Sequence, residues 1–403
     1  MPVLPLLLFV SIGKVQFPKT SSKRSQPSNS SNTILSKNII QSNAWILRHV
    51  PLGRFNANRD VILRSHTIDL SAIESDEVII ETDAISIDAF IRTTMGKEAY
   101  HGTVNINSPL NAFGYGKVIR AGRNTPFSKG DNVVGMIQAA TYSKLKCDGL
   151  HKMQTLPLTP PQTALHVLGI SGITAWIGLF ASPPQGPQRG ETVVVSAAAG
   201  AVGCIAAQMA KLTGARVIGI AGGKVKKEFL LETLGLDGAI DYKDGEKSLG
   251  QQLDEECPNG VDFFFDNVGG KTLDAVLERI NRNSRISLCG AISEYDSGKI
   301  NNKSTIVGPS HCIRLAETSS SMTGFNVMHH TKSFCSAIRY LGWNYYRGNI
   351  MCPEQIVDGL DQFPRAIETM FRPGGHCGRL IVDVSGKIVS SKEKKKEGLL
   401  SLP

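Results

Sequence analysis

The segment TVVVSAAAGAVGCIAAQMAK, residues 192–211, changes its pattern halfway along. Its first four residues are β-branched and predict a strand, and from Ala201 onward an Ala-rich pattern predicts a helix. Small residues form the turn between the two. This order is typical of phosphate-binding loops, because a helix start presents unpaired N–H groups and the positive end of the helix dipole.

The turn carries an incomplete dinucleotide fingerprint of the form Gly-x-Gly-x-x-Gly. Ala198 stands at the first glycine position, whereas Gly200 and Gly203 keep the other two. Alanine is tolerated at the first position if its φ is negative. We therefore expect Ala198, Gly200, Ala201, Val202 and Gly203 to hold a pyrophosphate. The alternative is a tight strand–helix turn that is packed only for its own sake.

Strands and helices alternate around this loop, from about residue 161 to residue 351. The run VDFFFDNV, residues 261–268, is apolar on both faces, as a strand buried between two helix layers must be. This rhythm predicts an α/β domain with a doubly wound parallel sheet, a Rossmann domain. The expected strands are residues 192–196, 216–221, 238–242, 261–268 and 285–290, and the expected helices are residues 201–213, 226–234 and 271–281.

The end of the second expected strand discriminates between the two nicotinamide cofactors. An NAD site places an acidic residue there to bind the ribose 2′-hydroxyl, whereas an NADP site places cations. This chain has no acid before Glu228 and supplies Gly222, Lys224, Lys226 and Lys227. Lysines at a helix start oppose the dipole, so a bound anion accounts for them better than a solvated helix start does. The sequence therefore predicts NADP(H).

The flanking segments predict a second, mostly-β domain. Between residues 44 and 160, the runs DEVIIETDAISI (76–87) and GDNVVGMI (130–137) alternate or are β-branched, and Gly- and Pro-rich turns separate them. Residues 359–384 predict a helix, a turn and a strand that needs a partner. We expect residues 352–387 to pack back onto residues 44–160.

The two ends carry most of the formal net charge of +9. Five basic residues in 1–43, and four Lys and two Glu in 392–397, leave 35 basic and 33 acidic residues in the body. Because basic and acidic residues are nearly balanced in the body, the charge does not indicate a nucleic-acid-binding surface. No apolar run approaches the roughly 20 residues of a membrane-spanning helix. We expect residues 388–403 to form a basic tail.

Residues 1–43 predict a targeting segment or, alternatively, a disordered extension. Val3–Ile12 is apolar, and the part that follows is rich in Ser and contains no acid. A signal-like stretch before a transit-like one suggests an organellar address, with bipartite plastid targeting as one option. Without such a signal the protein is expected in the cytoplasm.

The eight cysteines form no CxxC pair, so we expect reduced thiols rather than a four-thiolate zinc site.

Several linked motifs resemble the zinc-independent medium-chain dehydrogenase/reductases, in the branch of leukotriene B4 12-hydroxydehydrogenase and prostaglandin reductases. The resemblance spans about residues 43–384. It implies a GroES-like catalytic domain beside the Rossmann domain, and NADPH-dependent reduction of a carbon–carbon double bond conjugated to a carbonyl. The motifs are SIDAFIR (86–92), GITAWIGL (172–179), AAAGAVG (197–203), GIAGGKVKKEFL (219–230), DGAIDYK (237–243), FDNVGG (265–270) and ISLCGAISEY (286–295).

The resemblance implies roles for individual residues. Lys226 and Tyr242 match contacts to the 2′-phosphate, Asn267 matches a cofactor-binding asparagine, and Thr174 matches the lining of the cofactor cleft. Tyr295 matches a tyrosine near nicotinamide and substrate, where its phenol can donate a hydrogen bond to an enolate oxygen.

Three further positions bear on the roles that the resemblance implies. Tyr100 is the alternative donor for the enolate oxygen. His376 stands where the family has a cofactor-binding asparagine, and Ala199 where it has a serine.

No metal is expected, because Gly114-Tyr115-Gly116 stands where the zinc branch carries Gly-His-Glu. The absence of a Lewis acid favours reduction of an enal or enone. A quinone oxidoreductase and a non-catalytic NADPH-binding sensor or scaffold protein remain as alternatives. The oligomeric state is open, with a homodimer as one option.

Overall fold

The computed structural model describes residues 38–96, 102–153, 159–297, 307–372 and 374–388. Three of the predicted features lie wholly or mostly outside these ranges: Tyr100, the targeting segment (of which residues 1–37 are not described) and the basic tail (of which residues 389–403 are not described). Among the described residues, no helix combines the length and apolar character needed to cross a membrane.

The predicted doubly wound sheet is confirmed. Its six strands are all parallel and follow the order β10-β9-β8-β11-β12-β13. This is the Rossmann order 3-2-1-4-5-6, which reverses direction between β8 and β11. The strands are β8 Thr192–Ser196, β9 Arg216–Ala221, β10 Gly238–Asp241, β11 Val261–Asp266, β12 Ile280–Leu288 and β13 Ser321–Gly324.

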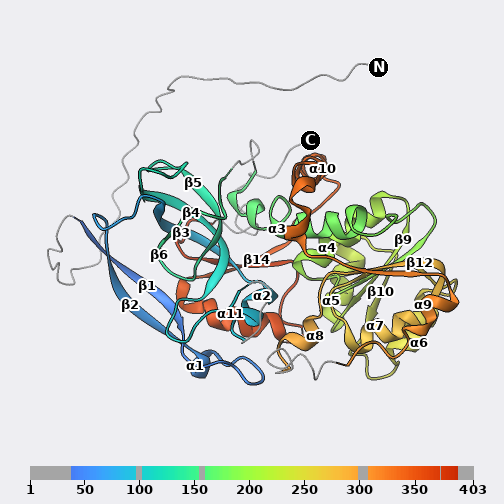
Figure 1. The fold of residues 1–403 in the computed structure, drawn as a ribbon. Helices are drawn as coiled ribbons and strands as arrows, with labels where there is room; N and C mark the ends of the chain where they lie inside the picture. Colours follow the sequence, from blue (N-terminus) through green and yellow to red (C-terminus); the bar gives the residue numbers. More distant parts are fainter. Residues whose placement is uncertain (1–37, 97–101, 154–158, 298–306, 373, 389–403) are drawn as a thin grey trace, which may run out of the picture. The chain divides into compact units, whose positions relative to one another are not determined.

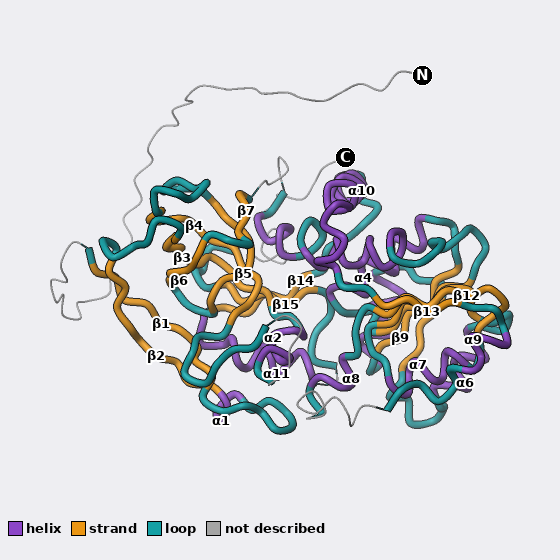
Figure 2. Tube along the Cα trace, in the orientation of Figure 1, coloured by secondary structure: helices purple, strands orange, loops and turns teal. Residues whose placement is uncertain are grey.

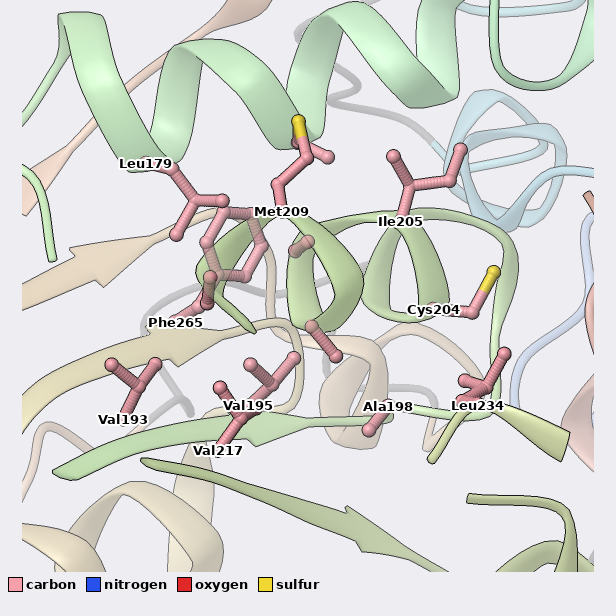
Figure 3. Close-up of a cluster of buried hydrophobic side chains, with 14 of the residues drawn as sticks. Leu179, Val193, Val195, Ala198, Cys204, Ile205, Met209, Val217, Leu234 and Phe265 are labelled. Carbon is pink, nitrogen blue, oxygen red and sulfur yellow. The ribbon is translucent and has the colours of Figure 1, made fainter. Parts of the chain in front are cut away.

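Alternate residues of the central strands face two different helix layers. Val193 and Val195 belong to the apolar cluster under α3 and α4, whereas Val194 belongs to the cluster under α6 and α7. Figure 3 shows the first cluster, in which Val193 and Val195 project from β8 toward α4 and Met209 projects from the far side of α4. The helices of this domain are α3 Ile170–Trp176, α4 Ala201–Leu212, α5 Lys224–Glu228, α6 Leu249–Glu256, α7 Gly270–Leu277, α8 Ile292–Tyr295, α9 Ile313–Glu317 and α10 Phe334–Tyr346.

Strand β12 is longer than expected, and the helix before it is shorter. We expected a helix over residues 271–281, but α7 ends at Leu277 and β12 begins at Ile280. The reason is tertiary pairing: Ile280 lies opposite Val261, whose N–H donates to the Arg279 carbonyl at 2.9 Å. Pairing with the start of β11 therefore outweighs the helical pattern of the sequence.

The second domain contains a sheet in the order β14-β15-β3-β4-β5-β7, with β6 also paired to β3 (Figure 1). The expected return of the C-terminal strand is confirmed, since β15 pairs antiparallel with β3. Strand β14 lies beside β15 in parallel, and α11 connects them (Figure 2). The elements are β3 Glu77–Ser86, β4 Asn111–Ala121, β5 Asn132–Gln138, β6 Tyr142–Lys146, β7 Leu150–Lys152, β14 Glu354–Asp358, β15 Arg379–Asp383, α2 Ala89–Thr94 and α11 Phe363–Phe371.

A β-hairpin precedes this sheet and starts earlier than the sequence suggested. Strand β1, Ile39–Leu47, pairs along its length with β2, Val61–Asp69, and the short helix α1, Ala57–Asp60, lies between them. The predicted boundary after Asn43 therefore falls inside β1. The reason is again long-range pairing, since the Ser42 hydroxyl donates to the Tyr142 carbonyl at 2.8 Å.

Candidate active site

A cavity of about 870 Å³ is lined by residues of both domains. It lies at the C-terminal ends of β8 and β11, where the strand order reverses and where doubly wound sheets bind their ligands. Helices α2, α8 and α11 lie near one another on its other side (Figures 1 and 2). The volume is in the range of small-molecule and cofactor sites.

Most of the residues expected at the site line this cavity. They are Gly200, Ala201, Val202, Gly203, Gly222, Lys226, Tyr242, Asn267, Tyr295 and His376. Thr174 and Ala198 do not line it, and Tyr100 lies outside the described residues. Thr174 is half-buried on α3.

Ala198 points into the protein core rather than into the cavity. Its N–H donates to the Ile220 carbonyl at 3.0 Å, and its methyl group is buried in the core (Figure 3). The residue with positive φ is instead its neighbour Ala197, at +48°. Ala197 and Ala199 line the cavity in the place expected for Ala198.

The two glycines of the loop serve different purposes. A Cβ at Gly203 would lie 2.9 Å from the Ala198 Cα, so only glycine lets α4 approach β8 this closely. A Cβ at Gly200 would meet only the Ala197 carbonyl, at 3.2 Å. Gly200 is the N-cap of α4, and the N–H groups that follow it have no intrahelical acceptor. These groups suit an anion at the cavity wall.

A buried network holds Asn267 at the end of β11. Its side-chain amide donates to the Ser196 carbonyl at 2.7 Å, and its backbone N–H donates to the Ser196 hydroxyl at 2.8 Å. That hydroxyl donates to Asp266 at 2.7 Å, and burial raises the pKa of the Asp266 carboxyl. The network joins the two strands at the reversal point and fixes the loop that carries Asn267.

Lys226 and Tyr242 lie together at another end of the cavity. A Cβ at Gly222 would lie 2.7–2.8 Å from the Tyr242 ring and hydroxyl, so this glycine makes room for the ring. Burial lowers the pKa of Lys226, the nearby Cys377 raises it, and the Lys243 ammonium lowers it again. The Lys243 ammonium lies 5.5 Å from the centre of the Tyr242 ring. Sequence analysis missed Lys243, although it directly follows Tyr242 in DGAIDYK.

The acidic residue near Lys226 and Tyr242 is already hydrogen-bonded to the backbone. Asp241 accepts the N–H groups of Gly223 at 2.6 Å and Lys243 at 2.9 Å. These hydrogen bonds let Asp241, the last residue of β10, fix the loop that follows β9. The end of β9 itself carries no acidic residue.

His376 contributes a polar atom that has no internal partner. Its Nδ1 is buried and makes no hydrogen bond with the described residues. Burial lowers the pKa of His376 to about 4, and the nearby charges of Lys226 and Arg379 act in the same direction. The ring is therefore neutral at pH 7, and His376 lines the cavity while its Nδ1 is enclosed by protein.

Arg379, three residues on, is a buried link that the sequence did not reveal. Its guanidinium donates to both carboxylate oxygens of Asp88, at 2.7 and 2.9 Å, and to the Ser171 hydroxyl at 3.0 Å. The pair thus joins β15 to the start of α2 and to α3. In the same segment, the Gly378 N–H donates to the Ala199 carbonyl at 2.8 Å, which ties the glycine loop to the other domain.

Tyr295 ends α8 and lines the cavity beside Gly290. Its phenol oxygen accepts the Ala291 N–H at 3.0 Å. The next residue, Asp296, accepts from the Arg92 guanidinium at 3.1 Å and from the Phe55 N–H at 2.8 Å. Both of these donors belong to the mostly-β domain, so the end of α8 is fastened to that domain.

Family models match both domains. The one described as zinc-binding dehydrogenase matches residues 201–338, and the one described as N-terminal domain of oxidoreductase matches residues 43–153. Among the described residues, no group of three or more His, Cys, Asp or Glu side chains is arranged to hold a metal ion. All eight cysteines are free thiols in the structure.

Related proteins match almost end to end. The 2-alkenal reductase (NADP(+)-dependent) of Nicotiana tabacum is 33% identical over 344 residues, 84% of this chain and 96% of that protein. Prostaglandin reductase 1 of Mus musculus is 31% identical over 355 residues, 85% of this chain and 99% of that protein. The crystal structure of CurA in complex with NADPH from Vibrio vulnificus matches with a TM-score of 0.76 at 30% identity, over 85% of this chain and 99% of that one. The chain therefore belongs to the medium-chain dehydrogenase/reductase family.

Proposed function

We propose that this protein is an NADPH-dependent reductase of carbon–carbon double bonds conjugated to a carbonyl. The observation that carries the proposal is the placement of Tyr295, a neutral donor, on the wall of the cavity that also holds the glycine loop and Lys226. The relatives from Nicotiana tabacum and Mus musculus, a 2-alkenal reductase and a prostaglandin reductase, support the same class of reaction.

The residues present fit NADP(H). The start of α4 suits the pyrophosphate, since its first N–H groups need acceptors. Lys226 and Tyr242 suit the 2′-phosphate, which carries almost two negative charges. The carboxamide of Asn267, which directly follows β11, suits a polar group of the nicotinamide half. When bound, NADPH supplies a hydride to the β-carbon of the substrate.

The chain's own contribution to the chemistry is to hold developing charge. Reduction at the β-carbon leaves an enolate, and Tyr295 stabilises its oxygen by donating a hydrogen bond. The Ala291 N–H that the phenol oxygen accepts polarises the phenol and makes it a stronger donor. A proton delivered to the α-carbon then completes the product. The buried Arg379–Asp88 pair is internally neutralised, so it leaves this part of the cavity without an unpaired charge.

The test is NADPH oxidation by the purified protein with enals, enones, oxo-lipids and quinones, followed by product analysis. Turnover of enals or enones to the saturated carbonyl compound is expected. Turnover of quinones alone would assign the protein to the quinone oxidoreductases instead. Tight NADPH binding without oxidation on the whole panel would indicate a sensor or scaffold protein.

A further inference from the structure

Arg54 reaches the cofactor cavity from the mostly-β domain. It lies in the loop that connects β1 to α1, and its exposed side chain lines the same cavity as Lys226 and Lys243. It is far from these lysines in sequence. No sequence motif pointed to it.

Both neighbours of Arg54 are anchored, so its backbone position is defined. The Gly53 carbonyl accepts from the buried Arg92 guanidinium at 2.8 Å, and the Phe55 N–H donates to Asp296 at 2.8 Å. Arg92 and Asp296 also bond to each other at 3.1 Å. The loop is therefore fastened to α2 and α8, at the rim of the cavity.

The cations around this rim have no acidic partner. Among the described residues, neither Arg54 nor Lys226 nor Lys243 takes part in an ion pair. By contrast, Lys224 on the same helix as Lys226 pairs with Glu228 at 3.8 Å. Burial lowers the pKa of Lys243, the Asp241 charge raises it, and the Arg54 charge is close enough to lower it again. Asp241 is the nearby counter-charge, and its carboxylate is hydrogen-bonded to the backbone N–H groups of Gly223 and Lys243. Three cations beside a single acid that forms no ion pair with them indicate a site for a multiply charged anion.

We propose that Arg54 is a third cation of the 2′-phosphate site, contributed from the opposite domain. The inference rests on the proposed NADP(H) cofactor. Arg54 acts beside Lys243 and Tyr242, and the pyrophosphate is expected at Gly200–Val202. The 2′-phosphate is therefore the group that Arg54 meets. NADPH would thus be held by both domains through its 2′-phosphate, and NADH, which lacks this group, would not.

The test measures binding, and so needs neither substrate nor turnover. The probes are 2′,5′-ADP, which carries the 2′-phosphate without a pyrophosphate, and 5′-ADP, which carries the pyrophosphate alone. Calorimetry should show that Arg54→Gln weakens 2′,5′-ADP binding about tenfold, as expected for one lost charge-assisted contact, and changes 5′-ADP binding less than twofold. Fluorescence titrations should give the same split for NADPH and NADH.

Two control variants distinguish a direct contact between Arg54 and the 2′-phosphate from a general effect of positive charge. Arg64→Gln removes one exposed cation of β2 that does not line the cavity and should leave all four dissociation constants unchanged. Arg54→Lys, which keeps the charge but not the planar fork, should restore part of the affinity for 2′,5′-ADP.

Equal weakening for 2′,5′-ADP and 5′-ADP would place Arg54 on the pyrophosphate or in a general field and would overturn the proposal. Unchanged binding of both probes would do the same. If the wild-type protein bound neither NADPH nor 2′,5′-ADP, the cofactor assignment itself would fail. Binding without enone reduction would affect only the proposed reaction.

Discussion

At the scale of single residues, Tyr295 is the side chain on which the proposed chemistry depends most. Its phenol lines the cavity and already accepts a backbone N–H, so removal of its oxygen would eliminate a donor without opening a large void. Loss of one such donor costs about 10²–10³ in kcat. Tyr295→Phe is therefore expected to lower kcat by this factor and to leave the NADPH Kd nearly unchanged.

The measurement is steady-state kinetics on the best enal or enone, together with a cofactor titration. A kcat within twofold of wild type would rule out Tyr295 as the enolate donor. Tyr100→Phe would then be the next variant to measure.

Lys226 is the residue that we propose to discriminate between NADPH and NADH. The proposed contact with the 2′-phosphate is charge-assisted and worth about 1.5–3 kcal/mol. Lys226→Ala should raise the KM for NADPH at least tenfold and leave the KM for NADH almost unchanged. Lys224→Ala is the matched control, since Lys224 is exposed, pairs with Glu228 and does not line the cavity. A constant ratio of the two KM values in Lys226→Ala would contradict the assignment.

At the scale of secondary-structure elements, the start of α4 depends on a buried histidine. His166 Nε2 lies 3.2 Å from the Ala201 carbonyl, so this nitrogen carries the proton and donates. The other nitrogen, Nδ1, is buried and has no partner among the described residues. Burial lowers the pKa of His166 to about 3, with the charge of Arg379 as a smaller cause.

This histidine makes stability fall in acid. An unfolded histidine titrates near pH 6.5, so below that pH the unfolded chain binds a proton that the folded one excludes. The contribution of neutral His166 is thus fully present above about pH 6.5 and is lost as the pH falls toward 3, by an amount on the order of a few kcal/mol. Urea unfolding from pH 7 to pH 4 should show a steeper loss for wild type than for His166→Gln. Parallel curves would contradict this account.

The first strand provides a second prediction for an element. Residues 39–41 pair with residues 67–69, and Ile68 in the middle of that partner segment is buried. A protein that begins at Asn38 should keep the melting temperature of the full chain. One that begins at Ser42 should melt a few degrees lower, because it loses these pairs. Equal melting temperatures for the two would show that the start of β1 adds no stability.

The elements also show why parts of the fold could be predicted from sequence. Strands β8 and β9 were predicted with their observed bounds, because burial on both faces leaves an unbroken apolar run. Strand β13 was not predicted, because its residues, SMTG, form no apolar run and none of them is buried. The start of β1 was missed for a related reason, since its partners lie in β2 and at Tyr142.

At the scale of the whole molecule, a buried ion pair secures the mostly-β domain at its border with the Rossmann domain, where Arg379 also donates to the Ser171 hydroxyl of α3 at 3.0 Å. Arg379 and Asp88 are 1% and 14% exposed, and the pair connects β15 with α2. Removal of one partner of such a pair typically costs about 3–5 kcal/mol, because the other charge stays buried and uncompensated. Arg379→Met should destabilise the protein by about this amount in urea unfolding, and the double variant with Asp88→Asn should recover part of the loss.

An exposed ion pair at the end of α11 serves as the control. Arg372 bonds Glu368 at 3.2 Å, and surface pairs of this kind contribute about 0–1 kcal/mol. Arg372→Met should therefore be nearly neutral. Equal effects of the two substitutions would show that burial of Arg379 does not set its contribution.

Contacts between distant segments set the limit of sequence-based prediction at this scale. The glycine loop, Lys226, Tyr242 and Asn267 could be located because each lies at the end of a predicted strand or helix. Arg54 could not, because its place beside Lys243 depends on how Arg92 and Asp296 fasten a loop that is distant in sequence. Likewise, Ala198 was expected at the cavity because the spacing identifies the turn, whereas only coordinates show that Ala197 has the positive φ.

The hydrogen bond between Gly378 and Ala199 also bears on how the protein is made. Synthesis runs from the N-terminus, so all six strands of the Rossmann sheet, through Gly324, are translated before the segment that carries His376, Gly378 and Arg379. Until that last segment leaves the ribosome, the glycine loop lacks its partner and β3 lacks β15. A nascent chain therefore completes this proposed cofactor site only near the end of translation, and NADPH should stabilise the finished protein more than a prematurely terminated one.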